Sequence, residues 1–333
     1  MGSEEAESFS PQQYKTLFII IAFESCLAIF ANFFIIFTYY RFKELRKRSH
    51  EMVLILSICT ILSNATYLLV PDQDNVNDAE CAFNGFVLNL FGMGTIFWTT
   101  WIAWCLYCAI VLQKSSPTLL LMFSVTWGVS LLLSSLPLFT NSYGRVGVVC
   151  WISPNTTAGL AFRFLCWYLP LWIAFSINLY LYRKVSKTLR NFAILSELSI
   201  ESSISKKNKE DEEELPYSKK LIYMANHLRW YPLIFVVSWL PKTLQLIIEA
   251  INPKLDKSFT FGLIHVTLHG VFYQSIGNVM VYGLNDKVRE KWTLLLENIK
   301  TKQSLYPLFK FEDVSNQPEN DIDITKQPKV ENL

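Results

Sequence analysis

The chain has 333 residues, of which 51% are hydrophobic and 15% aromatic, and its formal net charge is +2. A composition this apolar lies well outside that of soluble proteins of this size and excludes an ordinary soluble domain.

Seven apolar runs are each long enough to cross a bilayer. A hydrocarbon core of ~30 Å needs about 20 helical residues, because each residue adds ~1.5 Å. Helices are expected because an open strand in lipid would leave backbone groups unpaired. We therefore predict an all-α membrane protein, a seven-transmembrane helix bundle over residues 16–284 that follows an N-terminal segment, residues 1–15. The predicted spans are Thr16–Tyr40, Met52–Val70, Ala82–Leu112, Thr118–Phe139, Gly159–Tyr182, Leu228–Ile251 and Phe259–Leu284.

Basic residues in the connections predict how the bundle is oriented. Cytoplasmic loops of membrane proteins are enriched in Lys and Arg. The first and fifth connections are basic, whereas the N-terminus and the second connection are acidic. We therefore expect a multi-pass plasma-membrane protein with an extracellular N-terminus and a cytoplasmic C-terminus. The basic residues are Arg41, Lys43, Arg46, Lys47 and Arg48, then Arg183, Lys184, Lys187 and Arg190.

The outer side of this topology carries two further signals. Five of the seven cysteines fall within spans, but Cys81 and Cys150 lie at the outer end of span three and in the loop after span four. Both meet an oxidising exterior, so we predict a disulfide that ties this loop to the third helix. The same loop contains the sequon Asn155-Thr156-Thr157, and we expect Asn155 to be glycosylated.

Three polar regions are expected on the cytoplasmic side. Residues 183–220 contain many serines and an acidic run at 210–214, so we expect this connection to be largely disordered. Residues 286–300 place apolar side chains at helical spacing, which predicts a short amphipathic helix on the membrane surface. The tail, residues 301–333, is polar and expected to be disordered.

Several motifs, in order, resemble the cyclic-AMP-receptor-like family of G-protein-coupled receptors. They extend over nearly the whole bundle. They are Phe42-Lys43-Glu44-Leu45-Arg46-Lys47, Cys81, Phe97-Trp98-Thr99-Thr100, Ile102-Ala103, Trp127-Gly128, Cys150-Trp151, Pro170-Leu171-Trp172, Tyr231-Pro232-Leu233-Ile234, Trp239, Asn278 and Tyr282-Gly283.

The resemblance implies a receptor, not an enzyme, that transduces binding of an extracellular small molecule to a heterotrimeric G protein. Membrane lipids are its other expected partners, and we expect no cofactor, no metal and no nucleic acid. Pro241 predicts a kink that would let span six move. Trp239, Asn278 and Tyr282 are switch candidates, although Trp239 is equally interpretable as a packing residue.

Ionisable groups within the bilayer are candidates for a ligand site because they are costly to bury there. Lys242, Gln245 and Glu249 lie along span six, and His265 and His269 are one turn apart on span seven. Adjacent helices could combine these five side chains in one polar cavity, with a rim completed by Arg163 and Trp151. Alternatively, Lys242 pairs with a carboxylate such as Glu249, and the histidines bond between helices. Glu24 in span one has no partner that the sequence identifies.

Two departures from the family pattern affect the expected ligand. Gln245-Leu246 stands where family members commonly have Asn-Arg, so a cyclic nucleotide would lose a bidentate partner. Thr60 replaces an acidic residue in span two. A cyclic nucleotide and another polar ligand therefore both remain open.

Other classes of seven-helix protein make different demands on the sequence. A retinal protein needs a lysine in span seven, and Phe259–Leu284 contains none. A membrane zinc hydrolase could use His265 and His269, but a catalytic zinc needs a third ligand. A transporter would favour internal repeats and broken helices, and neither is visible, but a seven-helix transporter stays the alternative to a receptor.

Overall fold

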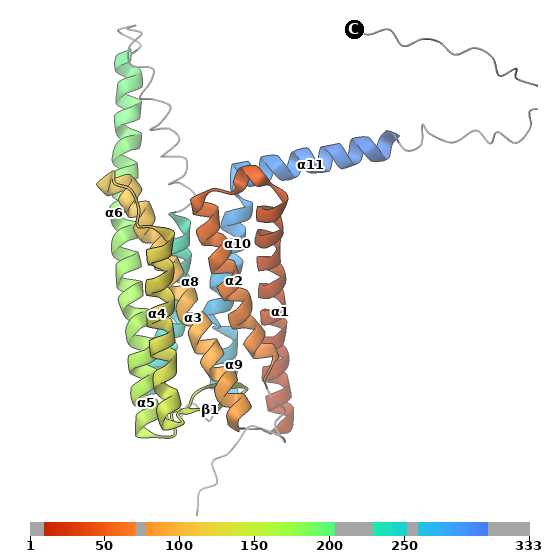
Figure 1. The fold of residues 1–333 in the computed structure, drawn as a ribbon, viewed down its shortest axis with the longest axis vertical. Coiled ribbons are helices and arrows are strands. Elements are labelled where there is room, and N and C mark those ends of the chain that lie inside the picture. The colour runs from red at the N-terminus through yellow and green to blue at the C-terminus, as the bar shows by residue number, and fades with distance from the viewer. Residues whose placement is uncertain (1–9, 71–77, 204–228, 252–258, 306–333) are drawn as a thin grey trace, which may run out of the picture. The chain divides into compact units, whose positions relative to one another are not determined.

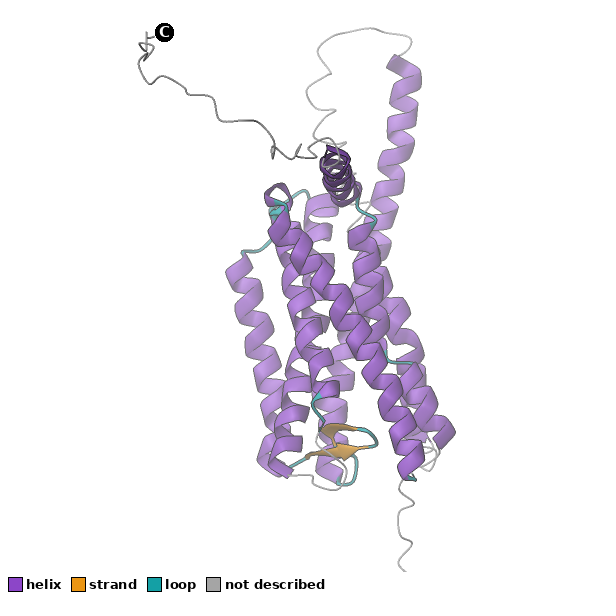
Figure 2. Cartoon of the chain, turned by 90° about the vertical axis from the view of Figure 1, so that its right-hand side faces the viewer, coloured by secondary structure: helices purple, strands orange, loops and turns teal. Residues whose placement is uncertain are grey.

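The computed structural model describes residues 10–70, 78–203, 229–251 and 259–305. Long helices run side by side, and a small hairpin lies at the end of the bundle where α1 begins (Figures 1 and 2). The main helices are α1 (Pro11–Arg41), α2 (Arg48–Leu68), α3 (Asp78–Tyr107), α4 (Leu119–Ser135), α5 (Thr157–Arg163), α6 (Leu169–Ser203), α8 (Trp230–Ile251), α9 (Phe259–Thr267), α10 (Gly270–Gly283) and α11 (Asp286–Leu305). Short helical turns are η1 (Lys43–Leu45), η2 (Cys108–Leu112), η3 (Leu136–Thr140) and η4 (Phe164–Tyr168).

These elements form the predicted seven-helix membrane bundle. Among the described residues, five helices are long and apolar enough to cross a bilayer, and α8 and the α9–α10 pair supply the sixth and seventh segments. The five are Pro11–Arg41, Arg48–Leu68, Asp78–Leu112, Leu119–Thr140 and Thr157–Phe192. The turns η2 and η4 are π-helical. η2 continues α3, and η4 joins α5 to α6.

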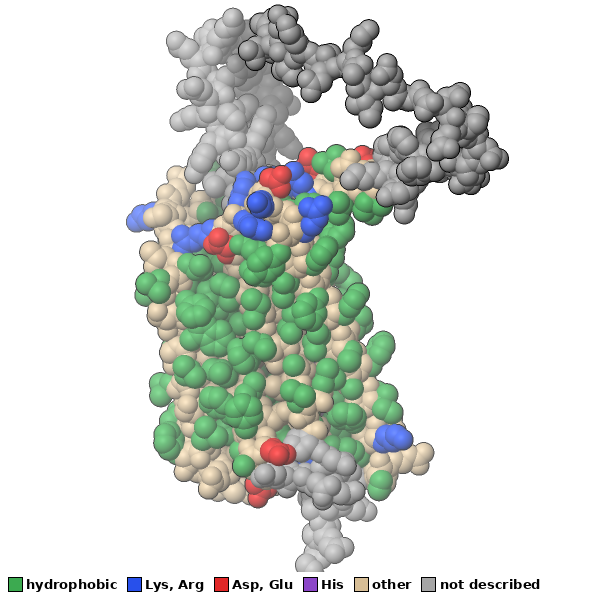
Figure 3. All heavy atoms as spheres, turned by 45° about the vertical axis from the view of Figure 1, so that its right-hand side comes forward, with side chains coloured by type: hydrophobic (Ala, Val, Ile, Leu, Met, Phe, Trp, Pro, Cys, Tyr) green, Lys and Arg blue, Asp and Glu red, His purple; other side chains and the backbone are tan. Residues whose placement is uncertain are grey.

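The surface of the bundle is apolar where a membrane would surround it. Phe23, Phe30 and Leu120 expose 68%, 77% and 76% of their area. Figure 3 shows hydrophobic side chains along the visible face and Lys and Arg side chains gathered near one end. The exposed basic residues of the α1–α2 connection and its flanks lie at the end away from the hairpin; they are Arg41, Lys43, Arg46, Lys47 and Arg48. A soluble protein rarely exposes so large an apolar surface, so lipid is the matching solvent.

Three predicted boundaries were wrong. Residues 11–15 belong to α1 because Ser10 and Gln13 form a capping box that starts the helix at Pro11. Residues 183–203 are helical in α6 rather than disordered; Val185 and Leu189 recur at helical spacing and pack against Leu106 and Ile110. Residues 301–305 extend α11. The acidic run at 210–214 and residues 306–333 lie outside the described part of the chain.

Span seven was predicted as one helix, but it is broken. α9 ends at Thr267, and His269, with ψ of 96°, precedes α10. Residues 286–300 are helical as part of α11, but their position on the membrane surface stays a prediction. The reason is that α11 extends from the unit that contains the bundle into a second unit, which begins at Glu290.

The connection after α4 forms a β-hairpin that the all-α prediction did not include. β1 (Tyr143–Val146) pairs antiparallel with β2 (Val149–Ile152), with Arg145 opposite Cys150. Gly147 occupies the turn with φ of 59°, a conformation that favours glycine. The hairpin is anchored to α3 by the predicted disulfide between Cys81 and Cys150, which the structure confirms.

Further contacts hold the hairpin against the helices. Tyr143 donates its hydroxyl to the carbonyl of Ser134 at 2.8 Å, and Arg145 Nη1 donates to the hydroxyl of Tyr14 on α1 at 2.9 Å. Val148 in the turn is buried and packs with Leu17 of α1. The hairpin therefore forms a fixed cover on this end of the bundle.

Replacing Cys150 with serine tests how far the disulfide secures this cover. We expect Cys150→Ser to destabilise the folded state by about 2–4 kcal/mol, because the bond closes a long loop. The Cys81→Ser/Cys150→Ser double variant should unfold at the same temperature as either single variant. Thermal unfolding in detergent measures both effects.

Cys26→Ser is the matched control, because Cys26 is an exposed free thiol. If it lowers the unfolding temperature as much as Cys150→Ser does, the stabilising role of the disulfide is refuted.

Candidate ligand-binding cavity

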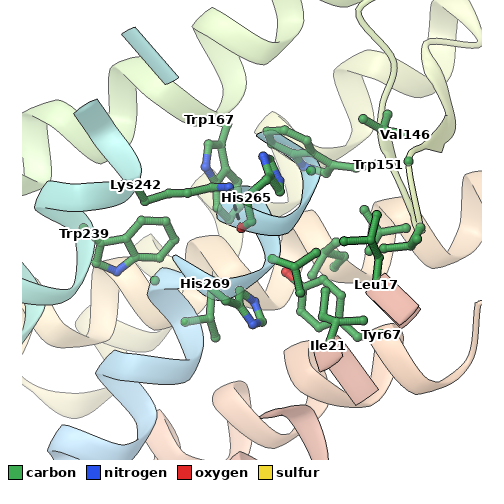
Figure 4. A pocket seen from close by; sticks show the side chains of 18 residues that line it. Leu17, Ile21, Tyr67, Val146, Trp151, Trp167, Trp239, Lys242, His265 and His269 are labelled. Carbon is green, nitrogen blue, oxygen red and sulfur yellow. Dashed lines mark hydrogen bonds between the residues drawn. The ribbon is translucent and has the colours of Figure 1, made fainter. Parts of the chain in front are cut away.

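A cavity of about 150 Å³ lies beneath the hairpin turn, between α1, α2, α3, α8, α9 and the start of α10 (Figure 4). Apolar side chains form most of its wall, and a few polar side chains converge on it. The lining residues are Leu17, Ile21, Tyr67, Leu88, Val146, Gly147, Val148, Val149, Trp151, Trp167, Trp239, Lys242, Gly262, His265, Val266, His269, Gly270 and Val271.

The break between α9 and α10 shapes one wall of this cavity. It places His265 in the last turn of α9 and His269 just before α10. Gly270 follows immediately, and a Cβ atom there would lie only 3.0 Å from the Trp239 ring. Glycine at this position therefore allows α10 to begin directly against the indole.

Lys242 reaches the cavity from α8, where its side chain extends toward His265 (Figure 4). Its ammonium donates to Gln245 Oε1 at 3.3 Å and to the backbone carbonyl of His265 at 3.4 Å. The second acceptor belongs to the C-terminal turn of α9, where the helix dipole favours a cation. His265 Nδ1 is buried without a hydrogen-bond partner among the described residues.

His269 meets the carboxylate that the sequence left without a partner. Its Nδ1 lies 3.6 Å from Glu24 Oε2 of α1, and both side chains are largely buried. The Tyr67 ring of α2 contacts the His269 ring edge to face, with centroids 4.6 Å apart. Three segments of the bundle, α1, α2 and span seven, therefore meet at His269. The sequence marked Glu24 as an intramembrane carboxylate, but nothing in it marked Tyr67.

Three tryptophans form the opposite wall. The ring centroids of Trp151 and Trp167 are 5.6 Å apart, and those of Trp167 and Trp239 are 6.0 Å apart. Trp167 belongs to the π-helical turn η4, in which Leu169 N–H bonds to the carbonyl of Phe164. The turn ends at Tyr168, two residues before Pro170, which has no N–H. Such turns are frequent at functional sites.

Trp239 also connects the cavity to hydrogen bonds inside the bundle. Its Nε1 donates to Gln274 Oε1 of α10 at 2.7 Å, and Gln274 Nε2 donates to Thr99 Oγ1 of α3 at 2.8 Å. The chain of bonds therefore links α8, α10 and α3. No sequence signal had identified Gln274, because one glutamine in an apolar run does not reveal its partners.

The structure brings together four of the seven predicted ligand-binding residues. Lys242, His265, His269 and Trp151 line the cavity, and buried Gln245 bonds Lys242. These placements do not test binding, so the assignments stay predictions. The Glu249 side chain lies outside the described residues.

Arg163 does not line the cavity. Its Nε donates to the carbonyl of Ile152 at 2.7 Å, and its guanidinium lies 4.8 Å from the Trp151 ring. Arg163, the last residue of α5, therefore supports the hairpin and Trp151.

The predicted switch residues lie at different depths. Trp239 lines the cavity, and Pro241 is inside α8. Asn278 and Tyr282 are buried in α10, and the Tyr282 ring contacts His50 at the start of α2. Tyr282 is about 20 Å from His269 along the helix at ~1.5 Å per residue. Asn155, the predicted glycosylation site, is exposed.

A bundle of seven membrane-crossing segments with a cavity under a disulfide-anchored hairpin defines a seven-helix membrane receptor. The family model of the 7 transmembrane receptor (rhodopsin family) matches residues 31–282. The chain therefore belongs to this family and is a G-protein-coupled receptor. This assignment favours a receptor over the transporter and zinc-hydrolase alternatives, because receptors of this family are generally not enzymes.

Individual relatives agree with this assignment and with the cyclic-AMP-receptor-like resemblance. "G-protein coupled receptor 1" of Arabidopsis thaliana is 30% identical over 270 residues, which cover 80% of this chain and 77% of the relative. "Cyclic AMP receptor-like protein A" of Dictyostelium discoideum is 26% identical over 284 residues, covering 84% and 67%. The crystal structure of squid rhodopsin has a TM-score of 0.64 and 16% identity, covering 96% of this chain and 97% of that one, and shows the shared fold.

Gly92 on α3 determines how closely Trp167 can approach, and this provides a test of the cavity wall. A Cβ atom at position 92 would lie 2.6 Å from the Trp167 ring. We expect Gly92→Ala to push the indole away and destabilise the fold by about 1–3 kcal/mol through overpacking. Thermal unfolding and the tryptophan emission spectrum measure the two effects.

Gly128→Ala is the control, because a Cβ atom there would meet nothing within 4 Å. It should leave the emission spectrum unchanged and not lower stability, since alanine favours helix. Equal behaviour of the two variants would contradict the proposed packing.

Proposed function

We propose that this receptor binds an extracellular small molecule in the cavity and activates a heterotrimeric G protein at the opposite end of the bundle. The ligand-binding residues are Lys242, His265, His269 and Trp151, with Gln245 positioning Lys242. The cavity supports this assignment because it is concave, mostly apolar and contains a few convergent polar groups.

The charge pattern supports an inward-facing G-protein surface. Exposed lysines and arginines lie at the end away from the hairpin, between 41 and 48 and between 183 and 190. In the proposed plasma-membrane orientation this end faces the cytoplasm, and the hairpin and Asn155 face outward. The extension of α6, held by Leu189 against α3, presents part of the basic surface.

One observation carries the proposed mechanism: Trp239 is at once a wall of the cavity and a hydrogen-bond donor to Gln274. A ligand that shifts the indole weakens this bond and so releases α8 from α10. Pro241 removes a backbone donor two residues further on, so α8 can bend there with little loss of internal bonding. The cytoplasmic part of α8 then moves relative to α3 and α6.

Gln274→Met tests this mechanism without a known ligand. The substitution removes the bonds to Trp239 and Thr99 but keeps the side-chain length. We therefore expect several-fold faster agonist-independent GDP–GTP exchange on a G protein. Wild type and variant are reconstituted separately in nanodiscs and assayed with a panel of purified heterotrimers.

Asn89→Leu is the matched control. Asn89 Nδ2 donates to Ser134 Oγ at 3.0 Å, which links α3 to α4 rather than to α8. This variant should lose stability but keep the basal exchange rate. The proposal fails if folded wild type and Gln274→Met accelerate exchange on none of the heterotrimers, or if the two amide variants raise it equally.

A further inference from the structure

A second recess lies on the outside of the bundle, between the neighbouring helices α3, α4 and α6 (Figure 1). Its volume is about 730 Å³, and it shares no lining residue with the cavity under the hairpin. We name it the outer groove; its lining includes Trp104 of α3, Val129 of α4 and Tyr180 of α6. Pockets that hold small organic molecules have volumes of roughly 300–1,000 Å³, so the outer groove is large enough for a bound molecule.

The outer groove opens toward lipid. Trp104, Val125, Ile177 and Tyr180 line it and expose between 37% and 54% of their area. All four belong to helices that are long and apolar enough to cross a bilayer. Water is absent from the core of a bilayer, so a recess at this place is filled by a component of the membrane.

The wall of the outer groove favours hydrocarbon. Three of its polar side chains already have hydrogen-bond partners, so an occupant gains little from them. Trp101 Nε1 donates to Thr126 Oγ1 at 3.0 Å. Thr100 Oγ1 donates to the carbonyl of Ile96 at 2.9 Å and accepts from Asn178 Nδ2 at 2.8 Å. Most of the other lining side chains are apolar, and an acyl chain matches such a wall.

Two exposed lysines of α6 continue the face that lines the outer groove. Lys184 Nζ lies 5.5 Å from the centroid of the Tyr180 ring, which belongs to the lining. Ile177, Tyr180, Lys184 and Lys187 recur at helical spacing, so they share one face of α6. Lysine stems lie along apolar surface while the ammonium groups reach the level of the lipid headgroups. The groove is therefore apolar along its length and cationic at the end away from the hairpin.

We propose that the outer groove is a binding site for one phospholipid with an anionic headgroup. One acyl chain lies against Trp104 and Val129, and the headgroup bonds Lys184 and Lys187. Phosphatidylcholine or a sterol would fill the same apolar wall but brings no net negative charge to the two lysines. In the proposed orientation the lipid comes from the cytoplasmic leaflet, which contains phosphatidylserine. The site depends neither on the proposed ligand nor on the proposed G-protein coupling.

Native mass spectrometry of the full-length receptor in detergent counts the lipids that stay bound. Phosphatidylserine, phosphatidylcholine and cholesterol are titrated separately. We expect phosphatidylserine to bind the outer groove roughly 25-fold more tightly than phosphatidylcholine, because each lysine near an anionic headgroup contributes about a fivefold preference. Cholesterol should bind no better than phosphatidylcholine.

One pair of variants tests the apolar part of the site. Val129→Trp fills the groove and should lower the number of bound phosphatidylserine molecules by one at saturation. Leu131→Trp is the matched control, because Leu131 is 46% exposed on the same helix and does not line the groove. It should leave the number unchanged.

A second pair tests the charge. Lys184→Gln should weaken the binding of phosphatidylserine to this site about fivefold and leave phosphatidylcholine unaffected. Lys15→Gln is its control, because Lys15 is exposed on α1 and does not line the groove. Both lysines are exposed, so this pair gives an independent result if Val129→Trp fails to fold.

The proposal is overturned if no phosphatidylserine stays bound, or if phosphatidylcholine or cholesterol binds as tightly. It is also overturned if the two tryptophan variants retain equal numbers of phosphatidylserine molecules, because contact with lipid would then not depend on the groove. Equal affinities of Lys184→Gln and Lys15→Gln for phosphatidylserine would refute the headgroup contact.

Discussion

A polar side chain inside a bilayer has no water to bond with, and the helix arrangement of this receptor depends on that constraint. Its apolar side chains face lipid as readily as protein, so burial of hydrocarbon gives little preference for one packing. Interhelical hydrogen bonds supply the preference. Asn32 bonds Ser275 across α1 and α10, and Asn178 bonds Thr100 across α6 and α3 at 2.8 Å.

The broken span seven follows from the same constraint. An interrupted helix in lipid exposes backbone groups that need other partners. Here the hydroxyl of Tyr273 donates to the carbonyl of Thr267 at 2.8 Å, within the break. His269 gains the Glu24 carboxylate, and Gly270 admits the Trp239 ring. A neighbouring side chain therefore bonds one of the carbonyls at the break, and the break places His269 and Gly270 in the wall of the cavity.

The sequence was sufficient to predict the seven-helix bundle but not the contacts between side chains inside it. Apolar runs and basic loops are local patterns, so they predicted the spans, and Cys81 and Cys150 were identifiable by their shared position outside lipid. Glu24 was recognisable as costly, yet its partner is 245 residues away in the chain, and periodicity carries no information about such distances. The sequence likewise gave no sign that α6 would continue past Arg183, because its charged face resembles a loop.

Lys242, His265 and His269 were identifiable as candidates because intramembrane charge and imidazole are costly, and they share one cavity, although their ligand role stays a prediction. Arg163 shows where this logic fails. An arginine at a helix end can donate hydrogen bonds to the backbone as well as to a ligand, and here Arg163 donates to the carbonyl of Ile152. Sequence position alone could not separate these roles, because both require a cation at the same depth.

The size of the cavity bears on how signalling could work. A ligand shifts a conformational equilibrium only by the difference between its interactions in the two states. Small ligands gain at most about 1.5 kcal/mol per non-hydrogen atom, so a molecule of a few atoms has little free energy to distribute. Its contacts must fall on a group that differs between the states. In the proposed mechanism Trp239 is that group, because it lines the cavity and its indole N–H donates to Gln274 on the neighbouring helix.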